Sequence, residues 1–179
     1  MTSPLHVVIA EPVGDRSASA HALLRDVLQE LTRTAAQDHV LTRRCGACGG
    51  PHGKPVLRHP ELHVSLSSTE GLVAVAVTDA GPVGVDVELE TRLGFAGFAD
   101  VALAPGEPDT RRGRTWTRKE AWLKATGTGL AVDPRTIDVS VPTPGVQLYD
   151  VPVADGIACA AAVLSTRRQV VSVERRVLG

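Results

Sequence analysis

Residues 71–90, GLVAVAVTDAGPVGVDVELE, contain two valine-rich runs that are separated by a turn sequence with glycine and proline. Branched side chains such as valine favour strands, and glycine and proline favour the turns between them. A third strand-like run, LHVSLSS, occupies residues 62–68 just before this stretch. We therefore expect residues 62–90 to form a small antiparallel meander.

The segments on either side of the meander add helices and further strands. LHVVIA at residues 5–10 predicts a strand, and SASAHALLRDVLQELT at residues 17–32 predicts an amphipathic helix with Ser17 or Ser19 as its N-cap. Further helices are expected near residues 95–103 and 114–126, and further strands near 136–141, 146–151, 157–164 and 169–174. This order predicts an α+β fold with two similar α+β halves, residues 1–90 and 91–179, in one compact unit with its seam near residues 90–95.

Composition limits the classes of function. The 179 residues are 43% hydrophobic and carry a net charge of −1, so no bulk attraction to nucleic acid or to an anionic membrane is expected. No apolar run is long enough to span a bilayer, and MTSPLHVVIAEPVGD lacks the blocks of a signal peptide. We expect a cytoplasmic protein whose three cysteines are reduced thiols.

Acidic side chains alternate along the strand-like run GVDVELE. Because successive side chains of a strand point to opposite faces, Asp86, Glu88 and Glu90 should share one face. Carboxylate oxygens suit Mg²⁺, which typically takes one or two carboxylates and completes its shell with water and substrate phosphate. The alternative is a solvent-facing polar edge, which we favour for Glu90.

Residues 115–130, TWTRKEAWLKATGTGL, place Glu120 and Lys124 one helical turn apart, before a pair of glycines. This spacing fits a stabilising pair on an exposed helix, but it also fits one wall of a site. Only three of the 19 basic residues are lysines, namely Lys54, Lys119 and Lys124. Since lysine is a compact charge that can reach a crowded phosphate group, their clustering favours the site.

Four motifs occur in a fixed order along the chain: GKP, HVSLSS, GVDVE and WTRKEAWLKATGTGL. In this order they resemble the Sfp-type 4′-phosphopantetheinyl transferases, which load acyl and peptidyl carrier proteins, including those of polyketide and nonribosomal peptide biosynthesis, with the arm of coenzyme A. The resemblance runs from about residue 43 to residue 132. It implies two α+β halves related by a pseudo-twofold axis, with the catalytic site in the cleft between them.

The resemblance also implies roles for individual residues. Mg²⁺ is expected at Asp86, Glu88 and Glu120, and catalysis at Glu120, Lys124 and Asp86, with Glu120 or Glu88 accepting a proton. The residues expected to bind the phosphates of coenzyme A are Lys54, Ser67, Ser68, Lys119, Lys124, Arg16, Arg43 and Arg44. Ser68 stands where the family usually has a histidine, and about half of the three arginines are expected to be merely solvated.

The implied reaction joins the phosphopantetheine arm to a carrier serine and releases 3′,5′-ADP. The partners would be coenzyme A and an acyl or peptidyl carrier protein, with neither nucleic acid nor membrane, and the protein would act as a monomer. The carrier should dock on residues 89–115, where Arg111, Arg112 and Arg114 could steer it and where Phe95 and Phe98 form either a docking spot or core.

Two other readings stay open at this point. The first is a protein that binds coenzyme A or a carrier with little or no turnover, because Ser68 cannot carry the charge of a histidine. The second is a zinc-stabilised interaction module, because Cys45 and Cys48 form a CxxC close to His39 and His52. A lone CxxC without a second pair is a weak signal for zinc.

Overall fold

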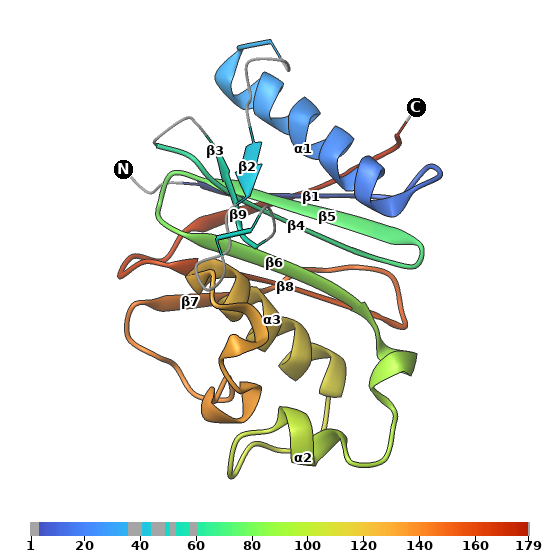
Figure 1. Ribbon diagram of the computed structural model, residues 1–179, viewed down its shortest axis with the longest axis vertical. Coiled ribbons are helices and arrows are strands. Elements are labelled where there is room, and N and C mark those ends of the chain that lie inside the picture. Colours follow the sequence, from blue (N-terminus) through green and yellow to red (C-terminus); the bar gives the residue numbers. More distant parts are fainter. Residues whose placement is uncertain (1–3, 36–40, 44–48, 51–52, 58–60, 179) are drawn as a thin grey trace.

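Two β-sheets lie between two helices in the computed structural model, which describes residues 4–35, 41–43, 49–50, 53–57 and 61–178 (Figure 1). The described elements are β1 (Pro4–Ala10), α1 (Arg16–Thr32), β2 (Leu41–Arg43), β3 (Pro55–Leu57), β4 (His63–Thr69), β5 (Leu72–Thr78), β6 (Val83–Leu89), η2 (Glu90–Leu93), α2 (Phe98–Ala102), α3 (Arg112–Thr126), η3 (Gly129–Ala131), η4 (Pro134–Thr136), β7 (Val146–Asp150), β8 (Ile157–Leu164) and β9 (Val170–Arg176). A four-stranded sheet has the order β4-β5-β1-β9, a three-stranded sheet has the order β6-β8-β7, and β2 pairs with β3. The α+β class expected from the sequence is confirmed.

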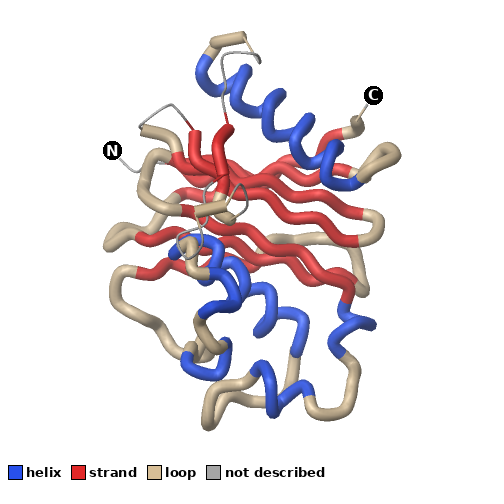
Figure 2. Tube along the Cα trace, in the orientation of Figure 1, coloured by secondary structure: helices blue, strands red, loops and turns tan. Residues whose placement is uncertain are grey.

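The layers follow from the alternation of side chains along the strands. In β1, Leu5, Val7 and Ile9 belong to the core between the two sheets, whereas Val8 and Ala10 belong to the core under α1. The four-stranded sheet is therefore apolar on both faces, and α1 covers one of them (Figure 2). The helix α3 packs against the three-stranded sheet on the other side of the molecule.

The expected meander is correct for its first two strands and wrong for its third. β4 and β5 pair in antiparallel register, but β6 pairs with β8 in the other sheet. Conversely, the C-terminal strand β9 joins the four-stranded sheet, where it pairs in parallel with β1. Each of the two sequence segments 1–90 and 91–179 thus contributes a strand to a sheet built mainly by the other segment, so the boundary between the segments does not separate the sheets.

Three local expectations differ from the structure. The N-cap of α1 is Asp15, whose side chain accepts a hydrogen bond from the Ala18 N–H, while the Ser19 hydroxyl bonds to the backbone of Val13. The helix expected at 95–103 is shortened to α2, Phe98–Ala102. Residues 136–141 form no strand; their segment holds the end of η4 and a loop that packs under α3.

The approach of α3 to β6 depends on small residues. A Cβ atom built on Gly84 would lie 1.9 Å from the Ala121 carbonyl oxygen and 2.7 Å from the Ala125 nitrogen. Ala121, Ala125 and Ala162 form the small core beneath the helix. Gly84 therefore lets α3 lie directly on β6, and this contact brings the helix side chains next to the acidic residues of β6. In the described part of the chain, no helix is both long and apolar enough to cross a bilayer.

Candidate active site

Lys124 and Asp86 form the centre of the candidate site. The Lys124 Nζ atom donates to Asp86 Oδ1 at 2.6 Å, to the Ser67 hydroxyl at 3.0 Å and to the Val85 carbonyl at 3.2 Å. Ser67 also donates to Asp86 Oδ1 at 2.9 Å. Burial raises the pKa of Asp86, against the opposing attraction of Lys124. Lys124 is therefore not one half of a solvated pair on a helix surface.

The strand β4 lines this centre with hydroxyl groups. The Ser65 and Ser67 hydroxyls accept hydrogen bonds from the Val85 and Val87 backbone N–H groups, which lie on the free edge of β6. Thr69 donates to Glu88 Oε1 at 2.9 Å. Sequence reasoning missed Ser65 and Thr69, although the period of two in SLSST could have indicated that three hydroxyl side chains share one face.

Asp86 and Glu88 share a face of β6, as expected from their alternation, but Glu88 is held by other groups. Its Oε1 atom accepts from Thr69, from the Leu89 N–H at 2.8 Å and from Arg92 at 3.4 Å. Glu90, at the start of η2, is exposed, as expected for a solvent-facing residue. The acidic pair that faces the site therefore consists of Asp86 and Glu88.

Glu120 carries an unsatisfied oxygen. Its Oε1 atom is the one buried side-chain nitrogen or oxygen, among the described residues, for which the structure contains no hydrogen-bond partner. Burial raises the pKa of Glu120, and the neighbouring Asp86 and Glu88 raise it further. A buried carboxylate oxygen without a partner is costly, so this atom indicates a missing cation or donor.

A pocket of about 380 Å³ opens beside this cluster. Its lining combines Glu120 and Lys124 of α3 with Ser65 of β4, Arg43 of β2 and Lys54 before β3. The Arg43 guanidinium donates to the Gly53 carbonyl and contacts His21 Nε2 at 3.3 Å. The pocket thus gathers three cationic side chains next to buried carboxylates.

Lys54 lies at the carboxyl end of α3. Its Nζ atom donates to the Ala125 carbonyl at 2.6 Å, which satisfies one of the free carbonyls at the helix end. Its side chain passes within 3.8 Å of the point where Gly127, at φ +78°, would carry a Cβ atom. Burial lowers the pKa of Lys54 to about 8.

Several expected ligands do not reach the pocket. The expectation that Lys119 faces the phosphates is not supported, because its side chain is fully buried in an ion pair with Glu107. Arg16 is exposed at the start of α1, and Ser68 is exposed on the opposite face of β4 from Ser67; neither lines the pocket. Arg44 lies outside the described residues.

The zinc hypothesis cannot be placed on the fold, because Cys45, Cys48, His39 and His52 all lie outside the described residues. Within the described part, no group of three His, Cys, Asp or Glu side chains is arranged to hold a metal ion. Asp86, Glu88 and Glu120 still have the oxygen chemistry that suits Mg²⁺, and the unpartnered Glu120 oxygen is consistent with a cation. Their donor chemistry therefore fits Mg²⁺ without forming a complete three-ligand site.

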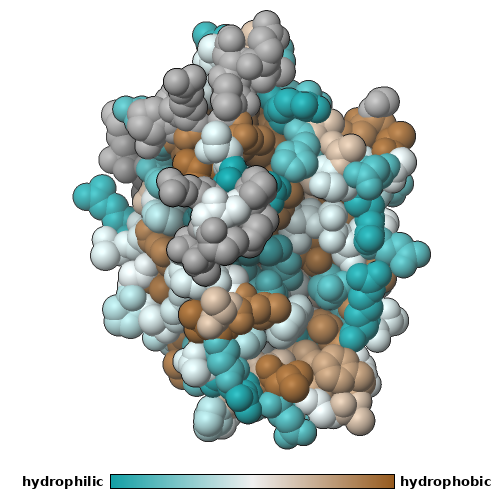
Figure 3. Space-filling model, in the orientation of Figure 1, coloured by the Kyte–Doolittle hydropathy of each residue, from teal (hydrophilic) through white to brown (hydrophobic). Residues whose placement is uncertain are grey.

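The segment expected to dock a carrier is partly structural. Phe98 is buried, and Arg112 pairs with Asp109 and lies over the Phe98 ring at 5.0 Å. Arg114 pairs with Asp150. Phe95 remains 48% exposed, and a patch of apolar surface is visible at the lower right of the molecule (Figure 3). Of the two alternatives for the phenylalanines, core is correct for Phe98, and a docking role is left for Phe95.

The central part of the chain has relatives of known class. The model of the 4′-phosphopantetheinyl transferase superfamily matches residues 82–151, from the start of β6 to the end of β7. A 4′-phosphopantetheinyl transferase, psf-1 from Bacillus pumilus, is 34% identical over 91 residues, which cover 45% of this chain and 39% of the relative. The chain thus spans about two fifths of the length of this curated relative. Over the segment that holds Asp86, Glu88, Glu120 and Lys124, the chain is similar to the 4′-phosphopantetheinyl transferase superfamily, which confirms the resemblance found in its sequence.

Proposed function

We propose that the protein is an Sfp-type 4′-phosphopantetheinyl transferase. It would transfer the 4′-phosphopantetheine arm of coenzyme A to a serine of an apo acyl or peptidyl carrier protein and release 3′,5′-ADP. The observation that carries the proposal is the buried, unpartnered Glu120 oxygen beside the Lys124–Asp86 pair, at a pocket with Lys54 and Arg43. This combination of carboxylates and cations suits a pyrophosphate substrate.

The roles of the residues follow from charge and reach. Lys124, Lys54 and Arg43 would bind phosphate oxygens and hold the pyrophosphate so that the reacting phosphorus faces the carrier serine. Glu120 would accept the proton of the serine hydroxyl, since burial raises its pKa and so makes its carboxylate a stronger base. Mg²⁺ held by Asp86, Glu88 and Glu120 would neutralise the charge of the pyrophosphate.

Ser67 would exchange partners when substrate binds. Its hydroxyl donates to Asp86 and accepts from Lys124. A phosphate oxygen near Lys124 could take over part of this hydrogen bonding, while the Val87 N–H keeps Ser67 in place. We also propose a monomer and a pseudo-twofold relation between the two helix-on-sheet units, with the site between them.

A protein that binds coenzyme A or a carrier without turnover is the second candidate. It is favoured by one observation, the exposed Ser68 at the position where the family has histidine. Such a protein would bind coenzyme A in the same pocket and leave the carrier unmodified.

Intact-protein mass spectrometry separates the two candidates. The protein is incubated with coenzyme A, Mg²⁺ and apo carrier proteins of the acyl and peptidyl types, and the carrier mass is followed over time. A gain of one phosphopantetheine that depends on Glu120, and not on the exposed control Glu90, supports the transferase. Coenzyme A binding by calorimetry without any gain in carrier mass supports the binding protein and refutes the transferase.

A further inference from the structure

The ion pair between Lys119 and Glu107 lies entirely inside the protein. The two side chains are 0% and 1% exposed, and every oxygen of the carboxylate is used. Glu107 Oε2 binds Lys119 and also accepts from the Ala104 N–H at 2.8 Å, while Oε1 accepts from the Val139 N–H at 2.7 Å. Lys119 in turn donates to the Pro134 carbonyl at 3.0 Å.

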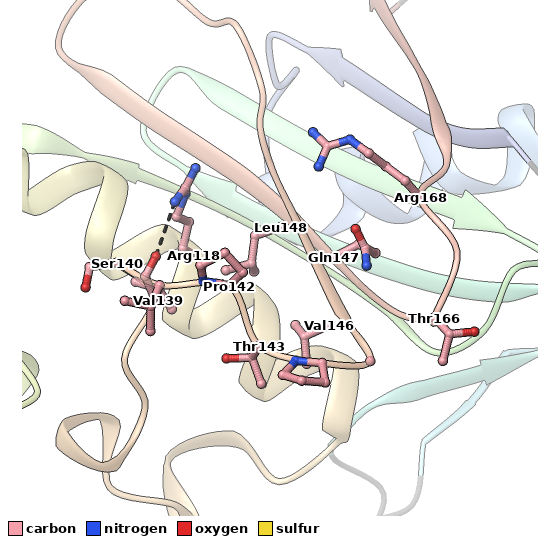
Figure 4. A pocket seen from close by; sticks show the side chains of 13 residues that line it. Arg118, Val139, Ser140, Pro142, Thr143, Val146, Gln147, Leu148, Thr166 and Arg168 are labelled. Carbon is pink, nitrogen blue, oxygen red and sulfur yellow. Dashed lines mark hydrogen bonds between the residues drawn. The ribbon is translucent and has the colours of Figure 1, made fainter.

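These bonds tie a segment that we call the strap, residues 133–139, to α3. Lys119 holds its beginning at Pro134, and Glu107 holds its end at Val139. Arg118, the neighbour of Lys119 on α3, donates to the Val139 carbonyl at 3.3 Å, drawn as the dashed line in Figure 4. Ile137 and Val139 of the strap pack with Leu123 of α3 in a buried cluster. The strap is thus fixed to the helix by polar and apolar contacts together.

The strap and the three-stranded sheet pack against different sides of α3. Ala121 and Ala125 face β6 and β8, and Lys119 and Leu123 face the strap or its anchor Glu107. Since successive residues of a helix are about 100° apart, the stripe of Glu120 and Lys124 lies between these two packed stripes. Rotation of α3 about its axis would therefore turn both site residues, and the sheet and the strap together oppose that rotation.

We propose that Lys119 and Glu107 are positioning residues, which lock the strap onto α3 and so fix the direction in which Glu120 and Lys124 point into the pocket. The structural part of this proposal stands on the contacts alone, and its catalytic consequence rests on the proposed function. A buried ion pair adds little net stability compared with apolar residues, but its directional hydrogen bonds can select one arrangement among several. Lys119 would thus serve the reaction without touching the substrate.

The test replaces the pair by apolar residues of similar size, in the variant Lys119→Met/Glu107→Leu. Three backbone groups of the strap and of the Ala104 turn then lose their buried partners, so the strap should open. Hydrogen–deuterium exchange with mass spectrometry measures protection in the full chain, without any ligand. We expect a loss of at least about 10-fold in protection for residues 120–129 and 133–139, with α1 unchanged.

The second readout is transfer at saturating coenzyme A. The double variant should lose at least about 10-fold in kcat with a smaller change in KM, because misdirected side chains affect the transition state more than ground-state binding. The matched control is Leu24→Ala, which opens a cavity in the core under α1. Well below its melting temperature, this control should keep the wild-type kcat and the protection of the strap.

The outcomes are distinguishable. Unchanged protection of α3 and the strap in the double variant, or a kcat within about twofold of wild type despite an open strap, overturns the positioning role. If the double variant does not fold, Arg118→Met removes the bond to the Val139 carbonyl together with the ion pair to Asp150, and should give the same pattern at about threefold. Asp150→Asn weakens that ion pair but keeps the Val139 bond, and should leave the strap protected. If wild type itself transfers nothing, the proposed function fails, and hydrogen exchange alone decides whether the pair locks the strap.

Discussion

Gly84→Ala tests whether the close approach of α3 to β6 builds the site. The substitution adds one methyl group at a buried position whose φ is not in the left-handed region, so the backbone itself tolerates alanine. The new Cβ atom would lie 1.9 Å from the Ala121 carbonyl oxygen, whereas ordinary contacts begin at 3.4 Å. The helix must therefore retreat by about 1.5 Å, the difference between these two distances.

This displacement acts directly on the site. Moving α3 by about 1.5 Å stretches the Lys124 Nζ to Asp86 Oδ1 contact from 2.6 Å to about 4 Å, beyond a hydrogen bond. Overpacking of this kind costs about 1–3 kcal/mol of stability, and a shift of 1 Å in catalytic groups can cost about 100-fold in rate. We expect a folded variant with a free energy of unfolding lower by about 2 kcal/mol and a transfer rate lower by about 100-fold.

Urea unfolding followed by circular dichroism measures the first quantity, and the carrier mass assay measures the second. The control is Gly94→Ala, whose Cβ atom would meet only the Thr91 carbonyl at 3.6 Å, and which should leave both quantities unchanged. A Gly84→Ala protein with wild-type stability and rate would show that the contact between α3 and β6 does not set the geometry of the site.

Three further predictions concern single side chains. Glu120→Gln should abolish transfer. Because the folded-state pKa of Glu120 is raised, the wild-type protein loses stability as pH rises from the ordinary carboxyl pKa through the raised pKa. Urea titrations should therefore show that the variant is more stable than wild type at pH 7, and that this difference vanishes near pH 4. Lys124→Arg should lower the transfer rate at least about 10-fold, since a planar guanidinium cannot make the three bonds of the ammonium group, and an unchanged rate would contradict this role. Lys54, with a pKa of about 8, should take up a proton when coenzyme A phosphates bind near it. Calorimetry at pH 8 in two buffers of different ionisation enthalpy should detect this proton uptake in wild type. If the uptake persists in Lys54→Met, Lys54 is not the group that takes up the proton.

Periodicity within single elements was predictable from the sequence. The alternation of GVDVE correctly indicated that Asp86 and Glu88 share a face, and the spacing of Glu120 and Lys124 correctly indicated that they share a stripe of one helix. These statements depend only on the fixed geometry of a strand and a helix. The same local information predicted α1, α3, β7, β8 and β9 to within a few residues.

Periodicity could not predict which strands pair with one another. The runs around β5 and β6 have similar composition and a short connection, which resembles a hairpin, yet the chain crosses from one sheet to the other between them. The hydroxyl groups of Ser65 and Ser67 then serve the free edge of β6 in place of a neighbouring strand. Such pairing is decided by which surfaces must be buried together, and this depends on the whole fold.

The three lysines show which properties were predictable from the sequence and which were decided only by the tertiary structure. Their place in two of the four ordered motifs helped to indicate the resemblance to the 4′-phosphopantetheinyl transferases, which the comparisons confirm. The sequence alone could not separate Lys119 from Lys124, because it defines the angle between two side chains on α3 but not what each of them faces. The packing of α3 on Gly84 and against the strap decides what each lysine faces. Lys124 lies at the pocket, whereas Lys119 is buried against Glu107, which lies outside α3.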